Sequence, residues 1–296
     1  LMPDGSEALL ATQGGGDQAV GAALWRIAEG SAQKVADVEA FERTNDPDKH
    51  VITTEGGADS WKDPACAPAS GPFTPGPQSN PYHFTRLSGG TLLIGDAAGN
   101  QVLRATPNGD ITSVAVFTPA TDSVGQFLEF PFDAGTPDDP SDDPMDGDCY
   151  VQPVPTSVAI GPDDHIYVGE LTGVGAVGVS RVWRIEPGAQ NVLCPSPACK
   201  VVKGDFTSIL DIAFGPEGDL FVAEFDEAGF GAALGFADPK GGTLNRCDLG
   251  TDACEVVADD LTFAGDIAFD KWGQLWVLED ILGSNGKPTV RRIALP

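Results

Sequence analysis

The stretch that decides the fold runs from Val154 to Gly173, VPTSVAIGPDDHIYVGELTG, and continues at Arg181–Ile185, RVWRI. It predicts three successive β-strands. A short apolar run ends at Ile160, the turn-forming residues GPDD follow, and a second apolar run closes on the acid Glu170. A glycine-rich loop then leads to the third run, which carries a tryptophan and two arginines.

Copies of this three-strand unit recur along the chain. The first two strands and their turn recur at residues 80–96 (NPYHFTRLSGGTLLIGD), 208–224 (SILDIAFGPEGDLFVAE) and 264–279 (AGDIAFDKWGQLWVLE), with a partial copy at 3–12. Repeats of this size with about four short strands each are typical of β-propellers, in which every blade buries its faces against its neighbours. The sequence therefore predicts an all-β protein, a β-propeller of four-stranded blades.

We expect one propeller domain over residues 1–296, with five blades visible. In chain order, its predicted parts are a partial blade (1–36), an insertion (37–79), a blade (80–117), an acidic insertion (118–152) and three further blades (153–206, 207–259 and 260–296). Both insertions are rich in residues that favour loops, so we expect them on the surface.

The charge of the chain limits its partners. It has 17 basic and 44 acidic side chains, a formal net charge of −27. Nucleic acids and anionic membrane surfaces bind positive charge, so neither is expected as a partner. No apolar run approaches the roughly 20 residues of a membrane span, so we expect no membrane insertion. The charge instead favours solubility, cation binding or life in salty water.

The six cysteines predict disulfides. Cys194 with Cys199, and Cys247 with Cys254, each flank a tight loop between two expected strands, which is a natural place for a cross-link. Cys66 and Cys149 remain in the two insertions. Zinc binding is the alternative, but the spacings do not match paired zinc ligands and no histidine flanks them. Disulfides predict a secreted protein in an extracellular or periplasmic compartment.

Several motifs carry a resemblance to a known family. They are DVEAFE (Asp37–Glu42) with NDPD (Asn45–Asp48), SNPY (Ser79–Tyr82), GDAAGN (Gly95–Asn100), VPTSV (Val154–Val158) and YVGELTG (Tyr167–Gly173). Through them the chain resembles the ScyD/ScyE-type propellers, secreted NHL-like proteins named after a scytonemin biosynthesis cluster. The resemblance implies a six-bladed propeller with one further blade upstream of residue 1. In that family an aromatic Phe-Pro-Phe segment usually follows Leu-Thr-Gly, whereas VGAVG follows it here.

An acid closes each expected second strand. These acids are Asp96, Glu170, Glu224 and Glu279. Arginines recur on the third strands as Arg26, Arg104, Arg184, Arg246 and Arg292. The acids could form a cation-binding ring. We favour a structural interpretation, in which each acid accepts hydrogen bonds from the loop that follows or pairs with an arginine of its own blade.

A second set of polar residues shares one position near the start of each innermost strand. This set is His83, Ser157, Asp211 and Asp266. Innermost strands line the channel of a propeller, so the four side chains are expected to converge. They could bind a ligand, hold Ca²⁺ through oxygen atoms, or offer a general base. The alternative is that strand starts are polar only for the sake of the preceding turn.

Gluconolactonase-type propellers offer a comparison for an enzymatic function. They hold a catalytic calcium ion with side chains of inner strands. The positions expected to align with those ligands carry Tyr82, Thr156, Leu210 and Gly265, none of which is a carboxylate. This departure counts against a lactonase, unless the site moves by one residue to the set that contains His83.

The acidic insertion is a candidate calcium site. It contains Asp138, Asp139, Asp142, Asp143, Asp146 and Asp148, without the spacing of an EF-hand. A solvated acidic loop is the alternative. In the other insertion, Trp61 is the tryptophan that we expect to contact a ligand or partner.

These observations predict a secreted, non-enzymatic propeller that acts as a binding or structural module. Its partner would be an extracellular protein, a glycan or a small ligand, and Ca²⁺ is the cofactor that the acidic residues suggest. Two alternatives stay open. One is a calcium-dependent lactonase or hydrolase that uses His83, Asp211 and Asp266. The other is a protein that assembles with copies of itself.

Overall fold

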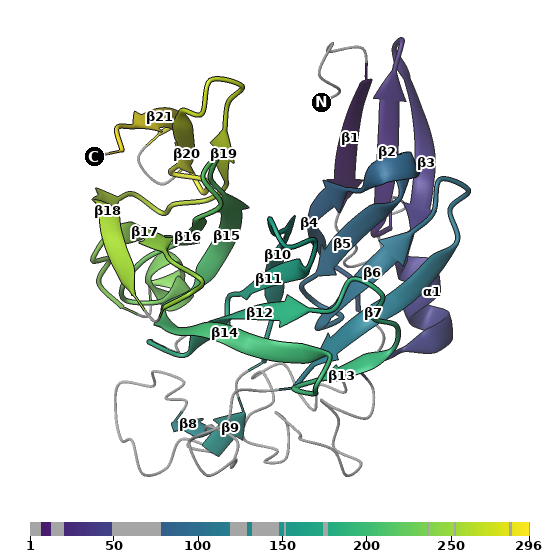
Figure 1. Ribbon diagram of the computed structural model, residues 1–296, viewed down its shortest axis with the longest axis horizontal. Coiled ribbons are helices and arrows are strands. Elements are labelled where there is room, and N and C mark those ends of the chain that lie inside the picture. The colour runs from purple at the N-terminus through teal and green to yellow at the C-terminus, as the bar shows by residue number, and fades with distance from the viewer. Residues whose placement is uncertain are drawn as a thin grey trace.

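The computed structural model describes residues 7–12, 21–48, 78–118, 129–131, 148–150, 152–173, 177–235, 237–251, 253–283 and 286–295. Nearly all regular structure in these residues is β-strand (Figure 1). The exceptions are the helix α1 (Val38–Asn45) and two short 3₁₀ turns, η2 (Ser88–Gly90) and η3 (Phe230–Leu234). None of the described helices is long and apolar enough to cross a membrane.

The strands form small antiparallel sheets that follow one another in chain order. The first has three strands, β1 (Glu7–Thr12), β2 (Ala23–Ala28) and β3 (Ser31–Asp37). The second contains β4 (Pro81–Arg86), β5 (Leu92–Asp96), β6 (Gln101–Ala105) and β7 (Ile111–Phe117). The third contains β10 (Pro155–Ile160), β11 (Ile166–Glu170), β12 (Ser180–Ile185) and β14 (Cys199–Phe206).

The C-terminal half continues in the same way. The fourth sheet contains β15 (Ile209–Phe214), β16 (Leu220–Glu224), β17 (Gly242–Cys247) and β18 (Cys254–Leu261). The fifth contains β19 (Ile267–Phe269), β20 (Leu275–Glu279) and β21 (Thr289–Ile293). Outside this series, β13 (Val192–Cys194) pairs in parallel with β7, and β8 (Glu129–Pro131) pairs with β9 (Asp148–Tyr150).

The local sequence explains why the first two strands of each sheet form a hairpin. The second strands β5, β11 and β16 are buried along their whole length, which accounts for their continuous apolar runs. The turn before each of β11, β16 and β20 contains a residue with positive φ, namely Asp164 (62°), Gly218 (92°) and Gly273 (76°). Glycine and aspartate tolerate this conformation better than most residues, so the turn chemistry sets where each hairpin bends.

The core lies between neighbouring sheets. Phe117 of the second sheet packs against Trp183 of the third, with ring centroids 5.4 Å apart. Tyr167 of the third sheet belongs to one apolar cluster with Val222 of the fourth, and Phe221 of the fourth contacts Phe269 of the fifth. Each sheet therefore buries its faces against the next, as the blades of a propeller do.

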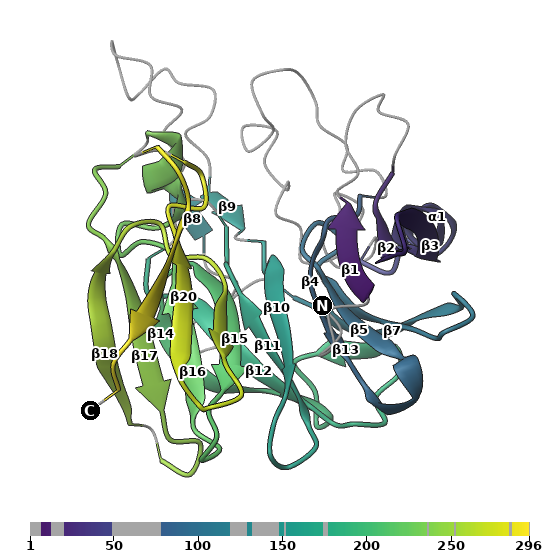
Figure 2. The same ribbon diagram turned by 90° about the horizontal axis from the view of Figure 1, so that it is seen from above.

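The sheets are arranged in an arc with their first strands on the inner side (Figures 1 and 2). The inner strands β4, β10 and β15 lie side by side, and β19 follows β15. The predicted fold class, a β-propeller, is confirmed. Among the described residues, three sheets have four consecutive antiparallel strands and the first and last have three. The predicted blade boundaries and a total of six blades stay predictions.

The two local disulfides are confirmed. Cys247 and Cys254 join the paired ends of β17 and β18. The disulfide between Cys194 and Cys199 joins β13 to β14. Because β13 adds to the second sheet and β14 belongs to the third, this disulfide also ties two blades together. Cys66 and the side chain of Cys149 lie outside the described part of the chain.

Candidate functional site

Three of the four acids that close second strands are bound by donors of their own blade. The Glu170 carboxylate is fully buried, forms an ion pair with Arg181 and accepts a hydrogen bond from Trp183 Nε1 at 2.8 Å. Burial nevertheless raises the pKa of Glu170, although Arg181 opposes that rise. This acid therefore depends on its partners to stay charged.

The acids of the fourth and fifth sheets are satisfied in the same manner. Thr243 Oγ1 and Asn245 Nδ2 donate to Glu224 Oε2 at 2.7 and 2.6 Å, and a backbone N–H of the preceding loop also donates to this carboxylate. Glu279 forms an ion pair with Arg291 at 2.9 Å and accepts from a backbone N–H. The structural interpretation of these acids is supported at all three positions.

The recurring third-strand arginines do not supply this pairing. Arg184 binds Asp163, with 2.8 Å between their charged atoms, and Arg246 binds Asp219. Both carboxylates lie in or beside the turn between the first two strands of the same sheet. The arginine that pairs with Glu170 is Arg181, which lies three residues earlier on β12.

Asp96, the fourth acid, has a different environment. It is fully buried, and its Oδ1 accepts from the N–H groups of Asn80 (2.6 Å) and Gly99 (3.2 Å). Its Oδ2 has no hydrogen-bond partner. Gln101 lies opposite Asp96 on β6, but the side-chain amide of Gln101 donates to Glu42 Oε2 at 2.6 Å. The Gln101 amide is therefore not available to Asp96 Oδ2.

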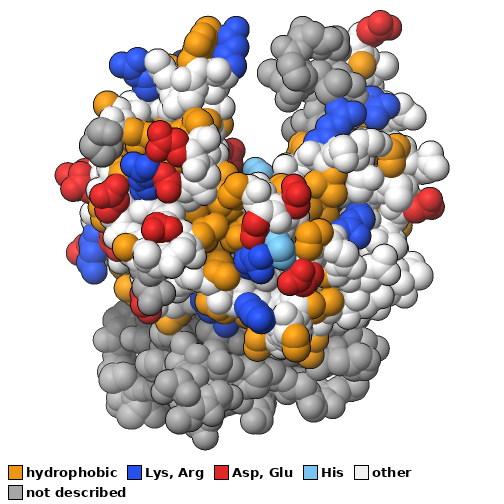
Figure 3. All heavy atoms as spheres, in the orientation of Figure 1, with side chains coloured by type: hydrophobic (Ala, Val, Ile, Leu, Met, Phe, Trp, Pro, Cys, Tyr) orange, Lys and Arg blue, Asp and Glu red, His pale blue; other side chains and the backbone are white. Residues whose placement is uncertain are grey.

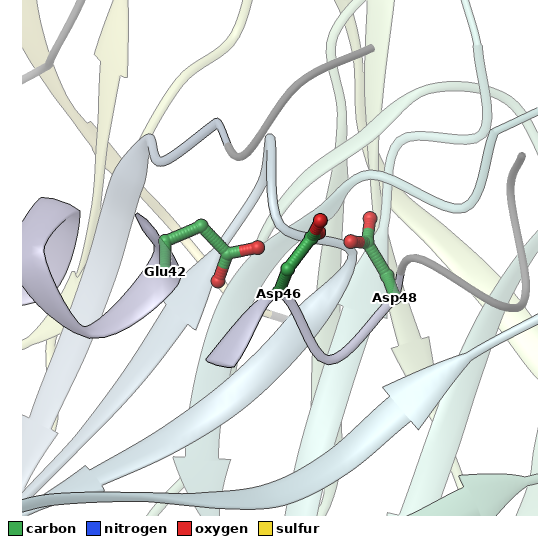
Figure 4. A group of neighbouring side chains, drawn as sticks. All are labelled: Glu42, Asp46 and Asp48. Atoms are coloured by element: carbon green, nitrogen blue, oxygen red, sulfur yellow. The ribbon is translucent and has the colours of Figure 1, made fainter. Parts of the chain in front are cut away.

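Glu42 belongs to a group of carboxylates at the end of α1 (Figure 4). Each of Glu42, Asp46 and Asp48 offers one oxygen within 4.8 Å of the others. The Glu42 carboxylate extends from the helix toward the other two in Figure 4. Asp46 takes the left-handed conformation that ends α1, with φ 41°, and its N–H donates to the carbonyl of Glu42. The helix end thereby brings the three acids together. We call these three residues and Asp96 the carboxylate cluster.

Burial and mutual repulsion raise the pKa values of carboxyl groups in this cluster. Burial, together with the charges of Asp48 and Asp96, raises the pKa of Glu42 to about 9. Burial likewise raises the pKa of Asp48 to about 7 and that of Asp96 to about 6. From the sequence, Asp96 is expected as a strand-closing acid, whereas Glu42, Asp46 and Asp48 stand out only as parts of a family motif. The spacing E-x₃-D-x-D across the end of a helix was the signal that could have marked three of them.

The predicted inner-strand residues do meet in part. His83 of β4 and Asp211 of β15 approach to 3.7 Å between Nε2 and Oδ1. Asp211 is 2% exposed, whereas His83 keeps 28% of its side chain exposed. The Asp211 carboxylate also accepts from two backbone N–H groups, those of Ile212 (2.8 Å) and Ile267 (2.9 Å). Asp211 therefore links the inner strand of the fourth sheet to that of the fifth.

Asp266 and Tyr82 complete this group. Asp266 is exposed beside the start of β19. Burial raises the pKa of Asp211 to about 6, and the Asp266 charge contributes to the rise. Burial and the charges of Asp266 and Asp211 raise the pKa of Tyr82 to about 12. We call Tyr82, His83, Asp211 and Asp266 the inner-strand cluster.

Ser157 lies in the sheet and not at an accessible surface. It is fully buried, and its Oγ has no hydrogen-bond partner. A Cβ on Gly169, which pairs with Ser157, would approach this oxygen to 3.0 Å, so the serine is enclosed by its own sheet. Of the four predicted inner-strand residues, Ser157 is fully enclosed, Asp211 is nearly so, and His83 and Asp266 reach solvent.

An apolar layer surrounds the inner-strand cluster. Tyr82 is partly buried against a group of buried side chains from the third, fourth and fifth sheets, which are Leu171, Leu210, Phe225, Ala232 and Phe263. Within it, Phe225 and Phe263 stack with centroids 4.9 Å apart. The site thus combines an exposed carboxylate, a half-exposed histidine and an aromatic ring.

The hydrogen bonds of His83 limit its chemistry. Its Nδ1 faces the N–H of Val158 at 3.4 Å and therefore acts as an acceptor. A neutral imidazole then carries its proton on Nε2, which faces Asp211. In this arrangement neither ring nitrogen offers a free lone pair for proton abstraction. The inner-strand cluster is better suited to hold a ligand than to act as a general base.

Other predicted site residues lie outside the described residues. They are Trp61, Asp138, Asp139, Asp142, Asp143 and Asp146. Asp148 lies in β9, where only the backbone is described. The calcium site expected in the acidic insertion stays a prediction.

Comparisons with known proteins find only distant similarity to solved structures. No family model matches the chain, and no curated protein does. Among solved structures, the chain is similar to the nidogen/laminin complex (11% identity, TM-score 0.48, 96% of this chain and 77% of that one). It is also similar to a gluconolactonase from Xanthomonas campestris (14% identity, TM-score 0.40, 70% of this chain and 56% of that one). A third similar structure is virginiamycin B lyase from Staphylococcus aureus (15% identity, TM-score 0.37, 74% of this chain and 71% of that one). The match therefore spans little more than half of the gluconolactonase.

Proposed function

We propose that this chain is an extracellular binding module that takes its ligand at the inner-strand cluster. The observation that carries the proposal is the meeting of Tyr82, His83, Asp211 and Asp266 from three sheets. Two of these side chains, His83 and Asp266, are open to solvent. Figure 3 shows the molecule hollowed between the sheets at the two ends of the arc. The two disulfides support an oxidising compartment.

The chemistry of the cluster favours a positively charged group on the ligand. An exposed carboxylate next to a tyrosine ring attracts an ammonium or guanidinium group through charge and through the ring face. The net charge of −27 would also steer a basic partner toward the molecule. We therefore propose an extracellular protein that presents an arginine or lysine side chain. We also propose that the chain is a member of the ScyD/ScyE-type propellers.

A titration with an arginine-containing peptide tests this function. We expect the backbone ¹H–¹⁵N signals of Val158 and Ile267 to shift, because their N–H groups contact His83 and Asp211. Asp266→Asn should remove most of the response. Asp110→Asn makes the same change at an exposed acid on the loop before β7 and should leave the response to the peptide intact. A response that survives Asp266→Asn, or none in the wild type, would contradict the proposal.

A calcium-dependent hydrolase is the second candidate, and the pairing of His83 with a buried Asp211 is what favours it. Such an enzyme should turn over a lactone or ester in the presence of Ca²⁺ and lose this turnover on replacement of His83 by alanine. A binding module should show no turnover that depends on His83.

Self-assembly is the third candidate. The strand β21 pairs only with β20 among the described strands, and most of its residues are exposed. An open strand edge can pair with another chain. Sedimentation velocity at increasing protein concentration tests this candidate, which requires a species larger than the monomer. Replacement of Val290, 65% exposed on this strand, by lysine should then reduce that species.

A further inference from the structure

We propose that Glu42, Asp46, Asp48 and Asp96 together bind one Ca²⁺ ion between α1 and the second sheet. This inference does not depend on what the inner-strand cluster binds. Its strongest support is a comparison within the chain, because the strand-closing acids Glu170, Glu224 and Glu279 occupy the equivalent position in three other sheets. Those acids show that a buried carboxylate at this position is stabilised by hydrogen-bond donors or by a positive charge.

The sheet register makes the comparison residue by residue. The residue opposite the strand-closing acid, and the one two positions further, lie on the same face of the third strand. In the fourth sheet these residues are Thr243 and Asn245, and both donate to Glu224. In the third sheet Arg181 and Trp183 donate to Glu170. Each acid is therefore satisfied from this one face.

The second sheet lacks these donors. The corresponding residues are Gln101, whose amide group donates to Glu42, and Leu103, which has no polar side-chain atom. In place of donors, the surroundings of Asp96 contain further carboxylates. Gln101 lies opposite Asp96 in the sheet and donates to Glu42, so the two carboxylates border the same residue.

Buried oxygen atoms without a partner point to the missing ligand. They are Glu42 Oε1, Asp96 Oδ2 and Gln101 Oε1, and their residues are 1%, 0% and 0% exposed. The Gln101 amide and Asp96 Oδ2 lie against the same small residue, because a Cβ on Gly99 would be 2.9 and 3.0 Å from them. An unpaired buried polar atom costs roughly 1–3 kcal/mol. All three are oxygen atoms that can accept, and each belongs to the carboxylate cluster or to Gln101, which contacts it, so a cation bound there would give them a partner.

The negative charge of the cluster also favours a bound cation. The carboxylates of Glu42, Asp46 and Asp48 lie together, and among the described residues no lysine, arginine or histidine forms a salt bridge with any of them or with Asp96. Arg43, which follows Glu42 on α1, pairs with Glu39 instead. A buried charge is stabilised when it is paired or coordinates a metal.

The donor set selects Ca²⁺. All available ligand atoms are carboxylate or amide oxygens, and the cluster contains no sulfur or imidazole donor. Such oxygen donors suit hard cations, whereas zinc and copper prefer nitrogen and sulfur. Ca²⁺ accepts about six to eight oxygen atoms in irregular arrangements, whereas Mg²⁺ needs a near-ideal octahedron and keeps several waters.

The ion would join three parts of the fold. Glu42 and the two acids after it belong to the helix end, and Asp96 ends β5. Asn100 donates to Asp48 at 3.0 Å, and its own Oδ1 accepts the N–H of Val154, the residue before β10. The site therefore connects α1 to the second sheet and, through Asn100, to the third.

Calorimetric titration of the chelator-treated full chain with CaCl₂ tests the site. We expect binding that Glu42→Gln and Asp48→Asn each weaken by about tenfold or more. Each substitution removes one charge and keeps an oxygen that can accept the existing hydrogen bond from Gln101 or Asn100. Asp110→Asn makes the same kind of change at an exposed acid outside both clusters and should leave this affinity unchanged.

A thermal melt separates a cation site from a purely structural cluster. With millimolar Ca²⁺, the wild type should melt several degrees higher than with EDTA, and Glu42→Gln should lose most of this gain. With EDTA, Glu42→Gln should melt at the same temperature as the wild type or higher, because glutamine fills the same space, keeps an acceptor for Gln101 and has no charge that burial could disfavour. A lower melting temperature for Glu42→Gln in both buffers would overturn the proposal. So would wild-type protein without a Ca²⁺ response, or an equal response to Mg²⁺.

Discussion

Replacing Arg181 by methionine should destabilise the protein through the carboxylate that it leaves behind. The guanidinium pairs with the fully buried Glu170 and lies 4.6 Å from the Trp183 ring. Methionine retains much of the apolar contact with that ring, but it brings no charge. Removing one partner of a buried ion pair costs about 3–5 kcal/mol. We expect a loss of this size in the free energy of unfolding, measured by urea denaturation at about pH 7.5.

The loss should depend on pH in a defined direction. Burial already raises the pKa of Glu170, and removal of Arg181 should raise it further. A carboxyl whose pKa is raised in the folded state contributes stability that is fully present below its ordinary pKa. That contribution is lost as the pH rises through the folded-state pKa. The deficit of Arg181→Met should therefore be small near pH 4 and largest at neutral pH.

A double variant identifies the buried charge as the cause. Glu170→Gln in the Arg181→Met background removes the charge and keeps an oxygen that can accept from Trp183 Nε1. It should recover much of the lost stability at neutral pH, as a non-additive pair does in a double-mutant cycle. A loss below about 1 kcal/mol for the single variant would refute the reasoning, because that is the value of an exposed pair. No recovery in the double variant would refute it as well.

Two further predictions concern the inner strands. Asp266→Asn should lower the pKa of Asp211 from about 6, because the Asp266 charge helps to raise it, and ¹³C NMR of the Asp211 carboxyl group measures the shift. The stability that protonated Asp211 contributes would then be lost at a lower pH than in the wild type. Gly169→Ala should lower the melting temperature, because its Cβ would lie 2.8 Å from Ile209 Cγ2 and 3.0 Å from Ser157 Oγ. Gly204→Ala, where a Cβ meets nothing within 4 Å, is the control and should have a small effect.

The repeat made the fold predictable from sequence. Apolar runs such as Ile166–Glu170 form strands that are buried on both faces, and turn residues such as Asp164 mark where the hairpins bend. The same periodicity placed His83 and Asp211 at one level of the inner strands, and their side chains do approach each other. It did not reveal that Ser157 is enclosed, because that depends on the close packing of Gly169 and the neighbouring sheet.

The pairing of the acids could not be predicted from composition alone. Arg181 and Arg184 both lie on β12, but an odd separation places them on opposite faces of the strand. Arg181 shares its face with Trp183 and reaches Glu170, whereas Arg184 reaches the turn residue Asp163. The alternation of side chains along β12 distinguishes the two arginines. Their recurrence in the sequence does not.

The carboxylate cluster was hidden by sequence distance. Glu42 and Gln101, which form a hydrogen bond, are 59 residues apart, and much of the first insertion lies between them. No periodicity relates an insertion to a blade. The acids at the end of α1 were visible as a motif, but only the fold places Asp96 beside them and leaves its second oxygen without a donor.

The same physical requirement then links two perturbations in different sheets. Chelation of Ca²⁺ would leave Asp96 without a counter-charge in the second sheet, as Arg181→Met leaves Glu170 without one in the third. The two sites share no hydrogen-bond partner among the described residues, so their effects on the free energy of unfolding should add to within about 0.5 kcal/mol. Urea denaturation of the wild type and of Arg181→Met, each with Ca²⁺ and with EDTA, measures whether the two effects add. If EDTA destabilises the wild type but not Arg181→Met, the two carboxylates are not neutralised independently, and the comparison between blades fails.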